Sequence, residues 1–503
     1  MRDLLNQTSF QFFLATLVMG LLFFFLGFAD VFFEGPHGIH FFRQTDSLSF
    51  ASQYFNKGFE FFQPRVFNLE NVDGRAACEF PIMYYLTALL YQFTGNHSFI
   101  LKSLNLLVVF AGLFAVFKLA NRILRDKVYS ALIALFFFTS TVFCYYSFNY
   151  LPNAPALGFT FLAWYFFYEY ISTERIQDGN YSAFFFSLAG LIKVTYLINP
   201  LTAICVLIGS KYFKYEQPID SSKRKRVSIW FIGVLVLPLV WNLYMLYFNK
   251  INESTSFLTT ALPIWKLSSQ EIFEVADYMW NYWYNKYFAH ASFHFLVAIT
   301  LISFALYKRA SSILLLHVVV LFFGSLSYAV LFYPKFLDHD YYFLALMPLI
   351  LFIIINGLKS IQNLTNKKLV HNLLKLSMLV IVLSGINYSQ SKLTKRYTRP
   401  IDEYERAGLT IQNHLKEINS LEISHDARVI VAPDESPNGA LYYLNRMGWN
   451  IKADEDLSSK VNQYKAEGAE FLILISNSYS AEEIDSLQLK PLWSNEDLSV
   501  YEF

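Results

Sequence analysis

The long hydrophobic runs limit most strongly what this chain can fold into. The first run, FQFFLATLVMGLLFFFLGFA, covers residues 10–29 and is long enough to cross about 30 Å of hydrocarbon as a helix. No convincing small-residue cleavage site follows it, so we expect a retained anchor and not a removed signal peptide. Only 16% of the 503 residues are charged, against about a quarter in soluble proteins. The chain is therefore predicted to be a polytopic α-helical membrane protein.

Further apolar runs follow at about residues 99–120, 129–148, 154–171, 181–213, 227–248, 291–307, 311–333, 341–357 and 370–388. The run at 181–213 is too long for a single helix, because one crossing needs about 20 residues. Pro200 also interrupts this run. We therefore expect two short spans there, and about 11 transmembrane spans in the whole chain.

The basic residues predict how these spans are oriented. Lys and Arg gather at residues 121–127, 211–226, 307–309 and 359–368. Cytoplasmic loops carry such an excess, and all four clusters fall on one side when 181–213 is counted as two spans. A single span would place 211–226 opposite 121–127. The prediction is a cytoplasmic N-terminus, with residues 31–98, 249–290, 336–342 and the chain after about 389 on the outer face.

The chain changes character from about residue 400. ARVIVAPD and EFLILISN have the pattern of short buried strands, while NGALYYLNRMGWN and LSSKVNQYKAEGA have the pattern of helices. We therefore predict a transmembrane catalytic domain at residues 1–390 and a small soluble α/β domain at 391–503 on the outer face. This second domain has no Gly-rich phosphate loop and no nucleophile motif, so an accessory or recognition role is favoured over an independent active site.

Two other features exclude classes of site. Cys78, Cys144 and Cys205 lie far apart in the sequence without a CxxC pair, so disulfides and cysteine-based metal sites are not expected. The net charge is +1, so no basic excess indicates a nucleic-acid partner.

The stretch GPHGIHFFRQTDSL, residues 35–48, places polar residues soon after the first span. Thr45 could cap a helix that Gly58 ends. Asp46 would then lie exposed in the first helical turn, where the helix dipole favours its ionised form. Such an amphipathic helix could lie in the interface plane, and Asp46 could accept a proton from a sugar hydroxyl. On spacing alone, a plain capping role for Asp46 is the commoner alternative, with Arg43 extending toward lipid head groups.

Two more polar sets fall on the predicted outer face. Glu79 stands directly before Phe80 and Pro81 in GRAACEFPIMYYLTALLY and could start a helix. The stretch FLDHDYYFLALMP, residues 336–348, brings charged and aromatic residues to the end of a span, namely Asp338, His339, Asp340, Tyr341 and Tyr342. Tyrosines at this depth are expected interface residues, whereas charged groups at a span's end usually pair or have a function.

Lys193 is the only charged residue within its apolar run. It could simply extend its ammonium group to the interface. Alternatively, it could bind a lipid phosphate at the outer interface, together with Arg43, Arg65 and Arg75.

Taken together, HFFRQTDSLSFA, GRAACEFPIMYYLTALLY, LIKVTYLINP and DHDYYFLALMP resemble the GT-C glycosyltransferase superfamily, in particular bacterial members related to protein O-mannosyltransferases and lipid A aminoarabinose transferases. The resemblance covers residues 1 to about 390. It implies the GT-C fold, a place in the bacterial inner membrane and a periplasmic active site. It also implies a polyprenyl-phosphate monosaccharide as donor, and inverting transfer to a hydroxyl of a lipid, glycan or protein on the outer face.

The resemblance assigns roles to single residues. Asp46 matches the acidic residue that acts as catalytic base, and Glu79 matches the acidic member of the second loop motif. The aminoarabinose transferases carry a lysine after that glutamate, whereas this chain has Phe80. Donor-phosphate binding should therefore fall to other cations, first Lys193 and Arg43, then Arg65 and Arg75.

The chemistry is consistent with these roles. A phosphate leaving group needs nearby positive charge more than a general acid, while the acceptor hydroxyl benefits from a carboxylate base. One carboxylate is sufficient for inversion, since retention normally needs a second one as nucleophile. The remaining polar residues are candidates for substrate binding: His40, Gln44, Asp338, His339, Asp340, Tyr341 and Tyr342.

No cofactor is required in this interpretation. A divalent metal is an open alternative, and Asp46, Glu79 and His339 could supply oxygen and nitrogen ligands. Two rival functions also stay open. A transporter or flippase of lipid-linked glycans could use the same interfacial cations, although no internal repeat typical of transporters is evident. A polymerase or ligase that uses a polyprenyl-diphosphate oligosaccharide would also join sugars at the outer face.

Overall fold

The computed structural model describes residues 8–209, 221–257, 260–476 and 478–503. The chain forms two compact units. The first, here the membrane unit, comprises residues 1–32, 102–242 and 260–395. The second, here the loop-module unit, comprises residues 33–101, 243–259 and 396–503. The first predicted outer loop therefore belongs to the same compact unit as the C-terminal module.

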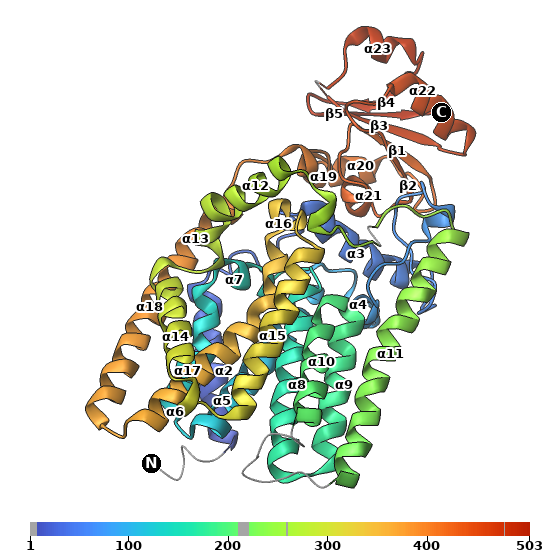
Figure 1. Ribbon diagram of the computed structural model, residues 1–503. Coiled ribbons are helices and arrows are strands. Elements are labelled where there is room, and N and C mark those ends of the chain that lie inside the picture. Colours follow the sequence, from blue (N-terminus) through green and yellow to red (C-terminus); the bar gives the residue numbers. More distant parts are fainter. Residues whose placement is uncertain (1–7, 210–220, 258–259, 477) are drawn as a thin grey trace. The chain divides into compact units, whose positions relative to one another are not determined.

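Helices dominate the chain, as predicted (Figure 1). Those that lie wholly or mostly in the membrane unit are α2 (Thr8–Phe25), α5 (Phe99–Leu124), α6 (Lys127–Phe136), α7 (Thr141–Ser147), α8 (Asn153–Thr173), α9 (Ile176–Ile192), α10 (Ile198–Gly209), α11 (Ser221–Ile251), α12 (Ser269–Tyr278), α13 (Tyr284–Tyr287), α14 (His290–Ala305), α15 (Ser312–Leu331), α16 (Lys335–Asp338), α17 (Met347–Leu364) and α18 (Lys368–Tyr397). The helices of the loop-module unit are α3 (Phe41–Asn56), α4 (Ile82–Thr94), α19 (Glu403–Asn413), α20 (Leu415–Ser420), α21 (Gly439–Leu444), α22 (Leu457–Ala466) and α23 (Ala481–Ser486).

The membrane-spanning character predicted from the apolar runs is confirmed. Among the described residues, six helices are long and apolar enough to cross a membrane, or up to eight if each of two bent helix pairs is one span. The first predicted run forms one of them, α2, which ends at Phe25. The predicted count of about 11 is not confirmed. Length is one reason, because α9 has 17 residues and α10 has 12, fewer than the roughly 20 that a straight crossing needs.

The run at residues 181–213 divides into two helices, as predicted, but not at Pro200. The break falls at Lys193, whose backbone is extended, and a short 3₁₀ segment, Val194–Leu197, leads into α10. Pro200 lies in the first turn of α10, where a missing backbone N–H removes no helical hydrogen bond. Residues 211–220 of the second basic cluster lie outside the described residues.

Close helix contacts build the interior of the membrane unit. At Gly112 of α5, an added Cβ would stand 2.6 Å from the Cα of Gly158 in α8, so the two glycines let these helices approach closely. Trp164 of α8 is fully buried and its indole N–H donates to Asn199 Oδ1 of α10 over 2.9 Å. In Figure 1 the helices α8, α9 and α10 lie side by side.

The C-terminal module is a five-stranded sheet with helices on both faces. Its strands are β1 (Val429–Ala432), β2 (Gly448–Asn450), β3 (Phe471–Ile475), β4 (Pro491–Ser494) and β5 (Leu498–Glu502), in the order β2-β1-β3-β5-β4. The first three strands in this order are parallel, and β5 runs antiparallel to β3 and β4. Val429 and Val431 pack with α19 and α21 on one face, whereas Ile430 packs with α22 on the other. The predicted α/β module is therefore confirmed.

Part of one helix prediction in this module is wrong. GWN at the end of NGALYYLNRMGWN forms β2, because α21 ends at Leu444 and Asn445 takes a left-handed conformation, with φ 51°. Gly448 is required in the strand that follows, since an added Cβ would stand 1.8 Å from the Val429 carbonyl oxygen. Strands β4 and β5 were not predicted.

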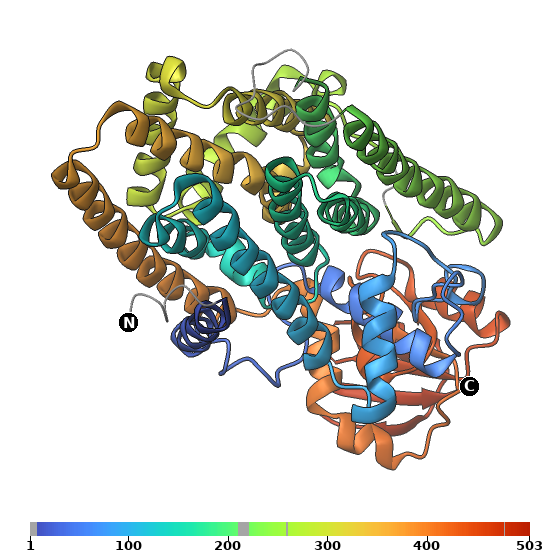
Figure 2. The same ribbon diagram turned by 90° about the horizontal axis from the view of Figure 1, so that it is seen from below.

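The first loop continues this sheet at the β2 edge. The backbone N–H of Leu69 donates to the Gly448 carbonyl over 2.7 Å, and the Gly448 N–H donates to the Phe67 carbonyl over 3.1 Å. Phe67 is buried in the same hydrophobic cluster as α19 and α21. Helix α3 of the first loop packs against α19 and α21, and Figure 2 shows the first loop, in blue, beside the orange and red module there. Loop and module thus share both a core and backbone hydrogen bonds.

Candidate active site

Helix α3 begins earlier than the sequence indicated. His40, in a left-handed conformation with φ 60°, is its N-cap residue. The side-chain amide of Gln44 donates to the carbonyls of His37 and Ile39, over 2.7 and 3.0 Å, and closes the turn before the helix. Thr45 does not cap the helix, because its hydroxyl donates to Phe42 O within α3 over 2.9 Å. The predicted helix end is confirmed, since Gly58, with φ 97°, directly follows the C-cap residue Lys57.

Asp46 therefore does not lie in the first helical turn, and it is not exposed. It follows the N-cap His40 by six positions and only 5% of its surface is accessible. The helix dipole acts within the first turn, so it cannot be what keeps this carboxylate ionised. Helix α3 is also buried on almost all sides, and does not have the single buried face of the predicted interfacial helix. Charged neighbours must compensate for the burial of Asp46.

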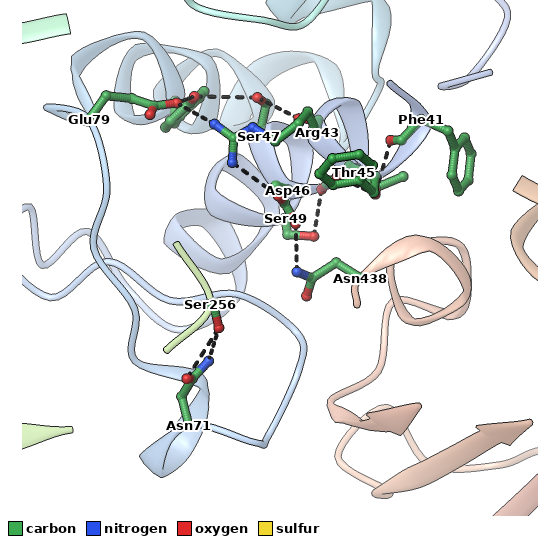
Figure 3. A network of polar contacts seen from close by, with 12 residues as sticks. Phe41, Arg43, Thr45, Asp46, Ser47, Ser49, Asn71, Glu79, Ser256 and Asn438 are labelled. Atoms are coloured by element: carbon green, nitrogen blue, oxygen red, sulfur yellow. Dashed lines mark hydrogen bonds and ion pairs between the residues drawn. The ribbon is translucent and has the colours of Figure 1, made fainter. Parts of the chain in front are cut away.

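Arg43 is that neighbour, and it joins two carboxylates (Figure 3). One guanidinium nitrogen lies 3.1 Å from Asp46 Oδ2, and the other lies 3.3 Å from Glu79 Oε1. The Arg43 side chain is 14% exposed, that of Asp46 is 8% exposed and that of Glu79 is 7% exposed. The guanidinium also lies over the ring of Phe257, 5.3 Å from its centroid. The structure thus brings together three of the predicted site residues in one buried ion-pair network.

Glu79 is held from a second helix. It stands just before α4, whose N-cap residue is Pro81, and the hydroxyl of Tyr84 donates to Glu79 Oε1 over 2.5 Å. Ser47 of α3 lies 3.3 Å from the same hydroxyl. Burial, and next the negative charge of Glu79, raise the pKa of Tyr84 well above its usual value. Tyr84 therefore stays protonated and remains a hydrogen-bond donor to Glu79.

A residue of the C-terminal module completes the network. The Asn438 side chain donates from Nδ2 to Asp46 Oδ1 over 2.8 Å. The sequence carried one signal for it, because Asn438 follows the carboxyl end of a strand, which is where α/β sheets place functional side chains. Tyr84 and Asn438 were both missed in the sequence.

The environment of Asp46 sets its acidity. Burial raises its pKa above the usual range, while the charge of Arg43 and the hydrogen bond from Asn438 act in the opposite direction. A carboxylate whose pKa is moved toward neutral is a stronger base when ionised. The arrangement is therefore suited to taking up a proton.

Arg65 and Arg75 form a separate cluster in the same unit. Both contact the carboxylate of Asp73, and the Arg75 contact measures 4.0 Å. Their backbones also pair as an isolated antiparallel bridge. Two guanidinium groups share one carboxylate here, so the cluster carries a net positive charge.

The other predicted site residues belong to the membrane unit. Lys193 is the C-cap residue of α9. In the stretch 338–342, Asp338 is paired with His339 and lies 3.8 Å from Lys335. Asp340 is fully buried and accepts a hydrogen bond from the Tyr146 hydroxyl over 2.6 Å. Tyr341 packs edge-on against Tyr146, and the Tyr342 carbonyl accepts a hydrogen bond from another tyrosine hydroxyl. Of the two aspartates in this stretch, Asp338 is therefore exposed and Asp340 is buried.

The acidic and histidine residues of the site do not form a metal-binding cluster in the described part of the chain. In the described part of the chain, no three or more His, Cys, Asp or Glu side chains are grouped so that they could hold a metal ion. Where Asp46 and Glu79 approach one another, Arg43 lies between them.

Comparison with known proteins shows a partial family match and a similar fold. Residues 79–245 match the family described as dolichyl-phosphate-mannose-protein mannosyltransferase. The chain is also similar to the crystal structure of ArnT from Cupriavidus metallidurans, over 96% of this chain and 98% of that one, with a TM-score of 0.60 and 10% identity. The chain therefore has the GT-C fold that ArnT has.

Two further GT-C structures have a similar fold. ArnT from Cupriavidus metallidurans bound to undecaprenyl phosphate matches over 98% of both chains, with a TM-score of 0.60 and 9% identity. The oligosaccharyltransferase AglB from Archaeoglobus fulgidus, in complex with an inhibitory peptide and a dolichol-phosphate, matches over 93% of this chain and 70% of its own, with a TM-score of 0.52 and 11% identity. No curated protein matches the chain by sequence.

The sequence match to the mannosyltransferase family covers some of the candidate site residues and not others. It begins at Glu79 and includes Lys193, but Arg43 and Asp46 precede it and the stretch 338–342 follows it. For those residues, the roles discussed below therefore depend on geometry and chemistry.

Proposed function

We propose that this chain transfers a monosaccharide from a polyprenyl-phosphate donor to the hydroxyl of a lipid, glycan or protein on the outer face of the bacterial inner membrane, with inversion. The observation that carries the proposal is the buried network in which Arg43 joins Asp46 and Glu79. Support for a lipid-linked donor comes from ArnT and AglB, whose structures contain undecaprenyl phosphate and dolichol-phosphate. No resident cofactor is part of the proposal.

The orientation follows from charge. The basic residues at 121–127, 307–309 and 359–368 are typical of cytoplasmic loops. They support a cytoplasmic N-terminus, with the loop-module unit on the periplasmic face. A sugar donor that acts there must cross the membrane as a lipid conjugate, because nucleotide sugars are confined to the cytoplasm.

In the proposed reaction, Asp46 is the base. The acceptor O–H bond breaks and its proton moves to the Asp46 carboxylate, while the acceptor oxygen forms a new bond to the anomeric carbon. The bond from that carbon to the phosphate oxygen breaks, and its electron pair leaves with the lipid phosphate. Attack and departure on opposite faces invert the anomeric centre, and no second carboxylate nucleophile is needed.

A carboxylate has about four lone-pair sites. Arg43 and Asn438 each take one site on a different oxygen of Asp46. Sites therefore remain for the acceptor hydroxyl. Glu79, paired with the same guanidinium, orients Arg43 in this proposal.

The departing phosphate needs cations. Lys193 is the leading candidate, since it lies at the end of a helix in a break between two apolar segments. Arg65 and Arg75 are further candidates because their cluster has excess positive charge. Arg43 is a weaker candidate for phosphate binding, because its positive charge is already paired with the carboxylates of Asp46 and Glu79.

The sugar or acceptor requires polar and aromatic contacts. We propose that they come from His40 and Gln44 at the start of α3 and from the stretch 338–342, with Asp338, His339, Asp340, Tyr341 and Tyr342. Stacking of sugar rings on tyrosine and hydrogen bonding to carboxylates would suit such a ligand.

The proposal is tested with Asp46→Asn, which keeps the shape of the side chain and removes its basicity. A deletion strain is complemented with the wild-type or variant chain, and its envelope lipids, glycans and proteins are compared by mass spectrometry. We expect the wild type to restore a sugar modification that Asp46→Asn does not restore. The matched control is Asp426→Asn, at a carboxylate that is 88% exposed, and it should behave as the wild type.

Two outcomes would reject the proposal. Full modification by Asp46→Asn would exclude Asp46 as base. A deletion strain in which the lipid-linked sugar stays on the cytoplasmic leaflet and does not reach the outer face would instead indicate a transporter.

A further inference from the structure

In the part of the chain that the structure describes, the C-terminal module reaches the candidate base through the side chain of Asn438. This residue is 1% exposed, and Asp46, which accepts its 2.8 Å hydrogen bond, is 5% exposed. Figure 3 shows Asn438 reaching Asp46 from the module, next to α3. A hydrogen bond to an ionised carboxylate is roughly twice as strong as one between neutral groups.

The orientation of the Asn438 amide is fixed from its other end. Its Oδ1 accepts hydrogen bonds from the backbone N–H groups of Phe67 and Asn68, over 3.1 and 3.0 Å. An amide oxygen can accept these bonds and an amide nitrogen cannot. The Nδ2 group must therefore be the one that faces Asp46.

The loop that carries Asn438 is itself anchored. The Asp434 carboxylate accepts from the backbone N–H groups of Ser436 and Ala440, over 2.9 and 3.1 Å. Asn450 donates to the Asp434 carbonyl over 2.8 Å, and Asn68 donates to Asn450 Oδ1 over 2.6 Å. This buried polar network connects the loop to the same part of the first loop that orients the Asn438 amide.

We propose that Asn438 is a positioning residue, which orients the Asp46 carboxylate and stabilises its negative charge, so that the C-terminal module is a working part of the active site. The inference rests on the proposed function of Asp46 as base. It goes beyond the accessory role expected from the sequence, because the module then acts on the transfer step itself.

Among the described residues, both charged and neutral groups act on Asp46. Arg43 comes from its own helix and Glu79 from the segment before α4, while Asn438 is the neutral donor from the module. Asp434, in the same loop as Asn438, directs its carboxylate to backbone N–H groups. A substitution of Asn438 should therefore change the pKa of Asp46, because the hydrogen bond from Asn438 lowers that pKa.

The test compares Asn438→Asp and Asn438→Ala in the full-length chain, in detergent or in vesicles. Asn438→Asp has nearly the same shape and can still accept from Phe67 and Asn68, but it replaces the donor facing Asp46 by an acceptor. Transfer is measured from a short-chain polyprenyl-phosphate pentose or hexose that the wild type consumes. The readouts are kcat, KM for that donor and the pH dependence of kcat. The control is Asn462→Ala, at an exposed asparagine of α22.

We expect both variants to lower kcat at neutral pH by about tenfold to a hundredfold, since a hydrogen bond to a charged group is lost. KM for the donor should change little. The acidic limb of the kcat profile should move to higher pH in both, and further in Asn438→Asp, because a second carboxylate opposes the ionisation of Asp46. Asn462→Ala should match the wild type.

A wild-type kcat in Asn438→Asp would overturn the inference, and so would a lower kcat with an unmoved acidic limb, which indicates a structural role alone. If thermal unfolding shows that Asn438→Asp does not fold, the pH profile of Asn438→Ala decides by the same criteria. The proposed function fails separately, if Asp46→Asn transfers sugar as the wild type does. An inactive Asp46→Asn together with a fully active Asn438→Asp rejects only the role of Asn438.

Discussion

Removal of the Arg43 guanidinium is the sharpest test of the buried network. Its nitrogens lie 3.1 Å from Asp46 and 3.3 Å from Glu79. At an effective dielectric constant of about 20, each contact corresponds to roughly 5 kcal/mol of attraction before the cost of desolvation is subtracted. Arg43→Ala removes the attraction but keeps the desolvation cost of Asp46 and Glu79, so it leaves two buried carboxylates without their cation. Breaking a buried ion pair in this way typically destabilises a protein by about 3–5 kcal/mol.

The expected loss depends on pH. Burial raises the pKa of Asp46, and Arg43 opposes that shift, so the variant should have a still higher pKa for Asp46 when folded. A carboxyl whose folded pKa is raised contributes stability that is fully present below its unfolded pKa and is lost as the pH rises through the folded pKa. The difference between wild type and Arg43→Ala should therefore be largest at neutral pH and shrink toward pH 4.

The measurement is the free energy of unfolding of the full-length chain in micelles, by chemical denaturation at a series of pH values. Arg175→Ala is a closely matched control, since Arg175 also pairs with an aspartate three residues later at 3.1 Å, but its side chain is 67% exposed. That aspartate, Asp178, also keeps a hydrogen bond from Thr173. The control should lose less than about 1 kcal/mol. Equal losses in the two variants, or a loss in Arg43→Ala that does not vary with pH, would refute the reasoning.

Four further outcomes are expected. Tyr84→Phe removes the hydrogen bond to Glu79 and should lower kcat by about tenfold in the transfer assay; an unchanged kcat would remove Tyr84 from the site. Lys193→Ala should weaken binding of a short-chain polyprenyl-phosphate sugar by about tenfold in a titration; unchanged affinity would place the phosphate site elsewhere. Burial raises the pKa of Asp434 to about 7, so its contribution to stability is lost as pH rises from about 4 through 7, and Asp434→Asn should flatten the unfolding profile over that window. Chelation with EDTA should leave transfer unchanged, and a loss that Mg²⁺ restores would show a metal requirement.

The broad architecture was readable in the sequence because it depends on long-range averages. Apolar runs of about 20 residues indicate membrane helices whatever their partners are. The division of residues 181–213 into two helices followed from the length of the run, from Pro200 and from the placement of the basic clusters. The strands Val429–Ala432 and Phe471–Ile475 were readable because each is a short apolar run between polar segments. The exact number of spans could not be obtained, since helices such as α9 and α10 are shorter than a full crossing.

Local geometry was harder to predict at the site. The start of α3 depends on a left-handed His40 and on two hydrogen bonds from the Gln44 side chain, and neither has a reliable sequence pattern. Thr45 looked like a cap because threonine is common there, yet its hydroxyl bonds inside the helix. The placement of Asp46 in the first turn was wrong for this reason, although Asp46 and Glu79 were both selected as site residues.

Asn438 could not be predicted from neighbouring residues at all. It is 392 positions from Asp46 in the sequence, and the contact exists because residues 67–69 extend the sheet of the module at the β2 edge. Strand β2, which this segment extends, itself packs beside β1 because Gly448 has no side chain and lets the backbone of Val429 come close. A single glycine in a segment first assigned to a helix thus helps to bring the module to the candidate base.

The charge count of the network limits how the phosphate can be bound. One guanidinium between two carboxylates leaves an excess negative charge when all three groups are ionised, and such a site repels an anionic donor. Either Asp46 takes up a proton, which its burial favours, or cations from elsewhere accompany the phosphate. The first option would remove the base that the reaction needs, so the second is the consistent one. Arg43 therefore serves the carboxylates first, and Lys193, Arg65 and Arg75 are the better candidates for the phosphate.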